Sequence, residues 1–167
     1  MVDSIPVVKA LVTIGVYGFT ADEFLAKLRA GGVRQLLDVR QRRGVRGSEY
    51  AWANARRLQD MLAQAGINYL HHKELAPTTE LRQLQYAEDD RLGVGKRSRE
   101  VLAPQYAERY VNEILNRVDL RPLVEEMPSR GRAALFCVER DPEACHRSLI
   151  AARLSDEFGL PVVHLRP

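Results

Sequence analysis

The chain has 167 residues, of which 46% are hydrophobic and 28% charged, and its net charge is +3. This length and balance are typical of one globular domain and exclude an intrinsically disordered chain. No apolar run approaches the roughly 20 residues that a membrane-spanning helix needs. The N-terminus carries Asp3 where a secretory signal has basic residues. We therefore predict a single domain over residues 1–167, with a cytoplasmic location and no membrane partner.

The first half of the chain alternates predicted strands with predicted helices. Residues 7–14 (VVKALVTI) form an apolar, β-branched run that predicts a buried strand. Thr20 and Glu23 have the spacing of a capping box, so a helix is expected over about 21–30, ended by Gly31 and Gly32. The further elements predicted in this half are a strand over 33–40, a helix from about 54 to 66 and a strand over 67–72.

The second half begins with a less regular stretch. The sequence Pro77-Thr78-Thr79 is suited to open a short helix, and the charged residues 86–103 predict a mobile loop of the kind that often covers a site. The elements predicted beyond it are a helix from 104 to about 118, a turn or two over 120–127, a strand over 132–139, a helix over 145–158 and a strand over 161–165.

Strands that alternate with helices imply right-handed crossovers and a mostly parallel sheet. We therefore predict an α/β, Rossmann-like domain with about five strands and helices on both faces. No GxGxxG or P-loop string is present, so no bound cofactor is expected. The two cysteines are too few for a disulfide framework, and their spacing lacks a CxxC or HxxxH partner, so no metal site is predicted. Nothing in the sequence predicts an oligomeric state.

Candidate functional residues collect at one edge of the predicted sheet, because ligands bind where parallel strands present their carboxyl ends. The catalytic candidates there are two carboxylates, a thiol and an imidazole: Glu139, Glu74, Cys145 and His146. The candidates for binding a substrate or anion are Gly15, Tyr17, Asp38, Arg40, Arg43, Arg46, His72 and Arg147. Cys137 lies at the end of an apolar strand and is either a core residue or part of the site.

The stretch CVERDPEACHR, residues 137–147, gives these candidates a chemical meaning. Asp141-Pro142 favours a tight turn, which places Cys145 near the first turn of the last helix. The free N–H groups and dipole of a helix start favour anions and thiolates. Arg147 adds a planar fork suited to phosphate or carboxylate. The pattern therefore predicts an anion site beside an activated thiol. The structural alternatives are that Cys145 is a small buried cap residue, that His146 caps or packs, and that Arg147 forms a salt bridge with Asp38 or Glu139.

Local charge density points to the same class of ligand. Between Arg34 and Arg57 the chain holds seven arginines and two acids, and a second basic cluster covers Lys96, Arg97 and Arg99. Such density favours an anionic partner, either a small molecule or a nucleic acid.

Four pieces of the chain, in order and nearly over its whole length, resemble the family called domain of unknown function 488. These pieces are TIG at 13–15, LLDVR at 36–40, AGINYLHHKEL at 65–75 and LFCVERDPEACHRSLIA at 135–151. The resemblance implies a compact α/β domain with recurrent residues at Gly15, Asp38, Arg40, Glu74, Cys137, Glu139, Cys145, His146 and Arg147. Two departures are Val16-Tyr17, where the family usually has His-Ser, and Leu75-Ala76, where it has Leu-Gly.

Three functions compete on this basis. The first is an enzyme, hydrolase-like or transferase-like, that acts on a phosphorylated or nucleotide-like substrate, with Glu139 or Glu74 moving protons. The second is covalent thiol or sulfur-transfer chemistry at Cys145. The third is a non-catalytic nucleic-acid-binding module that uses the arginines of residues 34–57.

Overall fold

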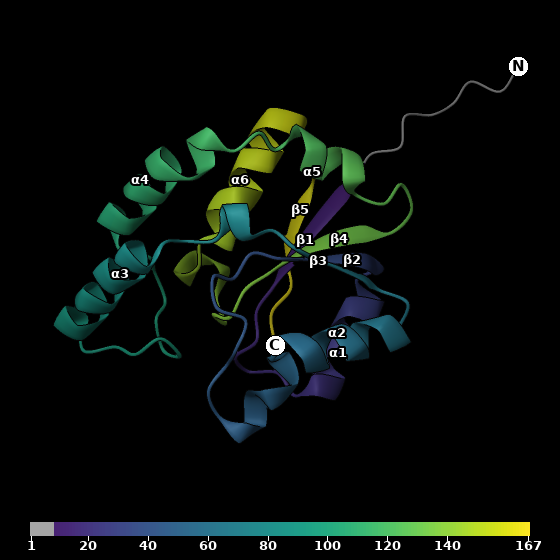
Figure 1. Cartoon of the computed structure of the whole chain (residues 1–167), viewed down its shortest axis with the longest axis horizontal. Coiled ribbons are helices and arrows are strands. Elements are labelled where there is room, and N and C mark those ends of the chain that lie inside the picture. Colours follow the sequence, from purple (N-terminus) through teal and green to yellow (C-terminus); the bar gives the residue numbers. More distant parts are fainter. Residues whose placement is uncertain (1–8) are drawn as a thin grey trace, which may run out of the picture.

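The computed structural model describes residues 9–167 (Figure 1). Five strands form one sheet in which every neighbouring pair is parallel. The strands are β1 (Ala10–Ile14), β2 (Val33–Asp38), β3 (Asn68–His71), β4 (Arg132–Phe136) and β5 (Val162–His164), in the order β3-β2-β4-β1-β5. The predicted parallel α/β domain is thus confirmed. The first two residues of the strand predicted over 7–14 lie outside the described residues.

Helices cover both faces of the sheet. They are α1 (Ala21–Ala30), α2 (Ala55–Gln64), α3 (Thr79–Leu92), α4 (Pro104–Glu113), α5 (Arg121–Glu126) and α6 (Arg147–Phe158). The chain steps from β1 to β2 and β3 in one direction and returns through β4 to β5 in the other. Right-handed crossovers then place α1 and α2 on one face and α3 to α6 on the other, as Figure 1 shows.

Local signals in the sequence fix α1 closely. The Thr20 side chain accepts a hydrogen bond from the Glu23 amide, and the Glu23 carboxylate accepts one from the Thr20 amide, which completes the predicted capping box. The helix ends at Gly31, as expected. Phe24 and Leu28 are its buried residues, and they pack into the core between helix and sheet.

The prediction of a loop over residues 86–103 is wrong for its first seven residues. Thr78 caps α3 by accepting a hydrogen bond from the Leu81 amide, and α3 then continues to Leu92 and ends at Gly93. The buried face of α3 consists of Leu81, Gln85 and Asp89. Because two of these three residues are polar and satisfy each other by a hydrogen bond, the face lacks the apolar periodicity that marks a helix in a sequence.

Two other boundaries differ because short 3₁₀ turns replace α-helix. The predicted helix 104–118 ends as an α-helix at Glu113 and continues as a 3₁₀ turn over Leu115–Arg117. The last helix begins at Arg147 and not at residue 145, because residues Pro142–Ala144 form a 3₁₀ turn. Cys145 therefore has an extended backbone, with φ of −138°, just before the helix.

Candidate functional site

A cavity of about 730 Å³ opens at the carboxyl edge of the sheet. Its walls come from the ends of β2 and β4, the loop 41–46, helices α3 and α4, and the loop 95–102. Seven cationic side chains line it: Arg40, Arg42, Arg46, Arg82, Lys96, Arg97 and Arg99. The single acidic side chain in the lining is Glu139. The cavity therefore carries a strong positive potential, which favours an anionic ligand.

Four of these cations have no carboxylate oxygen within 4.0 Å among residues 9–167, namely Arg42, Arg46, Arg82 and Lys96. Arg82 instead donates to Gln41 Oε1 and to the Tyr86 hydroxyl, each at 2.9 Å. Lys96 is half-buried, and burial lowers the pKa of its ammonium group. The charge of Glu139, together with smaller contributions from Tyr86, Cys137 and Tyr17, raises the pKa overall, so Lys96 stays protonated. Arg42, Arg46 and Lys96 are therefore the cations most available to a ligand.

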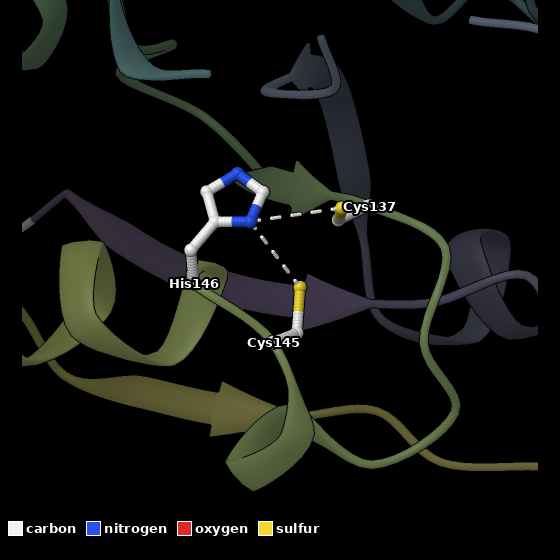
Figure 2. Close-up of side chains that lie close together, drawn as sticks. All are labelled: Cys137, Cys145 and His146. Carbon is white, nitrogen blue, oxygen red and sulfur yellow. Dashed lines mark hydrogen bonds between the residues drawn. The ribbon is translucent and has the colours of Figure 1, made fainter. Parts of the chain in front are cut away.

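The lining of the cavity includes Cys137, Cys145 and His146, all buried. Figure 2 shows these three side chains close together. His146 Nδ1 lies 3.9 Å from the sulfur of Cys137 and 3.8 Å from that of Cys145. His146 Nε2 lies 2.9 Å from the carbonyl oxygen of Val39, which only accepts, so this nitrogen carries a proton. The hydrogen bond orients the imidazole so that Nδ1 faces both sulfurs.

The two thiols have opposite pKa shifts. Burial alone raises the pKa of Cys145, but a hydrogen bond from Cys137 and the charges of Arg147 and His146 lower it well below its usual range. The hydrogen bond to Cys145 and burial raise the pKa of Cys137 well above its usual range. Burial lowers the pKa of His146, yet the charge of Cys145, the hydrogen bond with it and the charge of Glu139 together raise it overall. Cys145 is therefore the thiolate of the cluster and Cys137 its thiol donor.

Glu139 is the carboxylate nearest to this chemistry, and it is 7% exposed. Its Oε1 accepts a hydrogen bond from Arg99 Nη1 at 3.3 Å. Its Oε2 is buried and has no hydrogen-bond partner among the residues described. A buried carboxylate oxygen without a partner is costly in a protein interior unless a ligand or water satisfies it. Glu139 is thus ready to accept a proton or a donor group from a bound molecule.

Arg147 and Gly15, both predicted to bind an anion, do not line the cavity. The Arg147 guanidinium is fully buried and donates to the carbonyl oxygens of Glu139 at 2.7 Å and Arg140 at 3.2 Å. A Cβ atom on Gly15 would lie 2.0 Å from the same Glu139 oxygen. Both residues therefore hold the backbone of Glu139 in place and leave no surface for a substrate.

Asp38 and Arg40 form a buried ion pair at 2.8 Å. Arg40 also donates to the carbonyl oxygen of Ala53 at 2.8 Å, so its guanidinium reaches the cavity wall with most of its donors already used. Asp38, also a predicted binding residue, is fully buried and does not line the cavity. Arg43 lies outside the lining as well and donates to the Tyr69 hydroxyl at 3.3 Å.

His72 and Glu74, predicted for anion binding and catalysis, pair with each other at 2.6 Å away from the cavity lining. The predicted residues that the structure does bring together in the cavity are Tyr17, Arg40, Arg46, Cys137, Glu139, Cys145 and His146.

Several lining residues were not assigned to the site from the sequence. Arg82, Gln85 and Tyr86 come from α3, Tyr106 comes from α4, and Lys96, Arg97 and Arg99 come from the basic cluster of residues 96–99. The basic cluster was visible in the sequence. Its position in the cavity lining could not be predicted, because it depends on the full length of α3, which brings the chain to the cavity.

The thiol cluster also has the donor atoms of a soft metal site. The two sulfurs and His146 Nδ1 all lie within 4.8 Å of one another, and zinc prefers thiolate and imidazole ligands. The surroundings, however, carry seven cations against one carboxylate, a field that opposes a further cation and favours an anion. The absence of a metal at this cluster therefore stays a prediction.

The fold and the cavity define a class of protein: a parallel α/β domain with a cationic, thiol-containing site at the carboxyl edge of its sheet. Within this class, the chain belongs to the family described as "Domain of unknown function DUF488", which matches residues 20–154. The resemblance inferred from the sequence is thereby confirmed. No curated protein and no solved structure is significantly similar to the chain. Across residues 9–167, every helix is too short or too polar to cross a membrane.

Proposed function

We propose that the protein is an enzyme that acts on a phosphorylated or nucleotide-like anion by covalent catalysis at Cys145. One observation carries this proposal: the thiol with a lowered pKa lies in the lining of a cavity that is strongly cationic. A thiolate is a strong nucleophile, and the positive lining attracts and holds an anionic substrate against it.

Binding uses the three available cations. Arg42 and Arg46 offer planar forks for phosphate oxygens, and Lys96, which is less exposed than the two arginines, offers a point charge. The rings of Tyr17, Tyr86 and Tyr106 also line the cavity and offer apolar faces for a nucleobase or a sugar. A substrate with a charged group at one end and a planar ring at the other fits this arrangement of cations and tyrosine rings.

The chemistry divides into two steps. In the first, Cys145 Sγ attacks the electrophilic atom of the substrate, a new bond to sulfur forms, and the bond to the leaving group breaks. In the second, water or another acceptor attacks this intermediate while Glu139 Oε2 takes its proton, and the thiolate is released. Transfer to water makes the enzyme a hydrolase, and transfer to another acceptor makes it a transferase.

Binding is tested by thermal shift with a panel of phosphorylated sugars, nucleotides and short DNA or RNA. A ligand at a hundred times its dissociation constant stabilises the fold by about 2.7 kcal/mol. Arg46→Ala and Lys96→Ala are expected to weaken binding of the stabilising compound about tenfold or more. Arg29→Ala, an exposed change on α1 outside the cavity, is the control and leaves binding unchanged.

Catalysis is tested with the stabilising compound as substrate. Cys145→Ser is expected to retain binding and to lose turnover by about a thousandfold or more, because a hydroxyl at neutral pH is a far weaker nucleophile. Glu139→Gln retains binding and accumulates the covalent intermediate on Cys145. Full turnover by Cys145→Ser would overturn the proposal. Affinity that rises with nucleic-acid length and falls steeply with salt would replace it with nucleic-acid binding.

A further inference from the structure

The mechanism above uses one cysteine, yet the second lies beside it. The sulfurs of Cys137 and Cys145 are within 4.8 Å of each other, and His146 Nδ1 lies 3.9 Å from the first and 3.8 Å from the second. Both line the same cavity, and they are the chain's two cysteines. His146 and Arg147 supply an imidazole and positive charge to the Cys145 thiolate, and a hydroxyl in place of the Cys137 thiol would also donate to it. A second sulfur at this position therefore points to a further role.

We propose that Cys137 is a resolving thiol, and that Cys137 and Cys145 form a reversible disulfide when a hydroperoxide oxidises Cys145. The proposal rests on the proposed function in one respect, namely that Cys145 is the reactive thiol. It adds a second reaction of the site, with a hydroperoxide as co-reactant, that protects the catalytic sulfur from irreversible oxidation.

The reaction balances in two steps. The Cys145 thiolate attacks the hydroperoxide, the O–O bond breaks, an alcohol or water leaves with a proton, and a sulfenic acid remains on Cys145. Cys137 then attacks that sulfur, the S–O bond breaks, and the hydroxide leaves as water with the proton of the Cys137 thiol. In sum, two thiols and one hydroperoxide give a disulfide, an alcohol and water.

The backbone between the two cysteines permits the bond. A disulfide needs the sulfurs to approach to about 2.0 Å. Cys137 directly follows β4, whereas residues 138–144 lack regular strand or α-helix and contain only the 3₁₀ turn Pro142–Ala144. Cys145 follows that turn with an extended backbone. The required shift therefore falls on a turn and leaves the sheet intact.

Formation of the disulfide also affects Glu139, because this residue lies in the loop between the two cysteines. A disulfide removes the nucleophile and pulls on the segment that carries the proton acceptor, so the oxidised protein is inactive until reduced. Both sulfurs are buried but line a cavity of about 730 Å³, so small thiols and dithiols are the reductants that reach them.

The test treats the full chain with one equivalent of hydrogen peroxide under air-free conditions. The expected product has lost two hydrogens by intact mass and has no free thiol. Trypsin should release residues 133–140 linked to residues 141–147, because Arg132, Arg140 and Arg147 bound these peptides. Dithiothreitol should restore both thiols. This measurement uses the unaltered protein and does not depend on whether a variant folds.

Two variants of Cys137 separate its roles. Cys137→Ser keeps a hydrogen-bond donor beside Cys145, and Cys137→Ala removes it. Both are expected to trap Cys145 as a sulfenic acid that dimedone captures, and to yield sulfinic acid at least tenfold faster than the unaltered protein with excess peroxide. Cys145→Ser should leave Cys137 as a free thiol.

The outcomes distinguish this inference from the proposed function. A dimedone adduct on Cys145 of the unaltered protein, without the linked peptides, would overturn the resolving role alone. Linked peptides in a protein whose Cys145→Ser variant still turns over substrate would overturn only the proposed function. Inert cysteines under peroxide would overturn both.

Discussion

Arg99 binds Glu139 and Asp89 with one buried guanidinium. Its Nη1 lies 3.3 Å from Glu139 Oε1, and its Nη2 lies 2.6 Å from Asp89 Oδ2. Asp89 belongs to α3, Glu139 follows β4, and all three side chains are buried. A third donor contact, from Arg99 Nη1 to the carbonyl oxygen of Ala144, reaches the residue before Cys145. One side chain thus fixes α3 against both the carboxylate and the thiol turn of the site.

The first prediction follows from that arrangement. Arg99→Met removes the partner of a buried carboxylate, so the free energy of unfolding should fall by about 3–5 kcal/mol. Urea denaturation measures the change. The control is Arg91→Met, which breaks the exposed ion pair between Arg91 and Glu88, both on α3. It should leave the free energy of unfolding unchanged. Equal losses in the two variants would contradict a structural role for the buried pair.

The C-terminal part of α3 could not be predicted from the sequence. The caps of α1 predicted that helix to the residue, because Thr20, Glu23 and Gly31 act on their immediate neighbours. The buried face of α3 gave no such signal. Asp89 is buried there because it accepts a hydrogen bond from Arg99, 10 residues away, and Gln85 because it accepts one from the Ala103 amide, 18 residues away. Long-range partners of this kind follow from the packed structure and not from local pattern.

The partners of Arg147 at the site also could not be predicted from the local sequence. The sequence predicted that the carboxyl edge gathers Cys137, Glu139, Cys145 and His146, because parallel strands end together, and the structure places all four in the cavity lining. It assigned Arg147 to the ligand as well. A guanidinium at a helix start looks the same in sequence whether it faces a phosphate or carbonyl groups. The register of β1 against β4, which pairs Ile14 with Phe136, brings the Glu139 backbone to Gly15 and Arg147.

The second prediction uses that difference. Arg147→Lys keeps the charge but loses the fork that binds two carbonyl groups, so the free energy of unfolding should fall by about 1.5–3 kcal/mol. Affinity for the anionic ligand should change little once the folded fraction is taken into account. Arg46→Lys, in the cavity lining, should give the reverse pattern. Urea denaturation and ligand titration of both variants measure this. A stable Arg147→Lys protein with weakened binding would contradict this prediction and indicate that Arg147 binds the ligand.

The third prediction concerns the close approach at Gly15. In Gly15→Ala the new methyl group would lie 2.0 Å from a backbone oxygen, so the end of β1 or the Glu139 segment must move. We expect a loss of about 3 kcal/mol or more, at the upper end for overpacked sites. In Gly44→Ala the nearest atom would be the Asn54 Oδ1, at 3.9 Å, so the change in that control should stay within about 1 kcal/mol. Thermal or urea denaturation gives both values. A Gly15→Ala protein as stable as Gly44→Ala would contradict the packing of β1 against Glu139.

The fourth prediction is a pH dependence at His164. Its Nδ1 lies 2.7 Å from Thr13 Oγ1, and that oxygen also accepts a hydrogen bond from Arg147 Nε at 3.4 Å. The Thr13 hydroxyl therefore donates to Nδ1, which suits the neutral imidazole. Burial and the charge of Arg147 lower the pKa of His164, with a smaller contribution from Arg166 and an opposing one from Glu143.

The direction of the stability change follows from this shift. The unfolded histidine has a pKa of about 6.5, and the folded one lies lower, so between these values the unfolded chain binds more protons. The free energy of unfolding then falls as the pH drops from about 7 towards 5. His164→Asn removes this contribution, so its stability should fall less steeply over the same range. Because His164 binds one proton, the difference in slope cannot exceed about 1.4 kcal/mol per pH unit, and the partial exposure of the ring reduces it further. Urea midpoints of the two proteins across that range measure it, and parallel profiles would show that His164 titrates alike in the folded and unfolded chains.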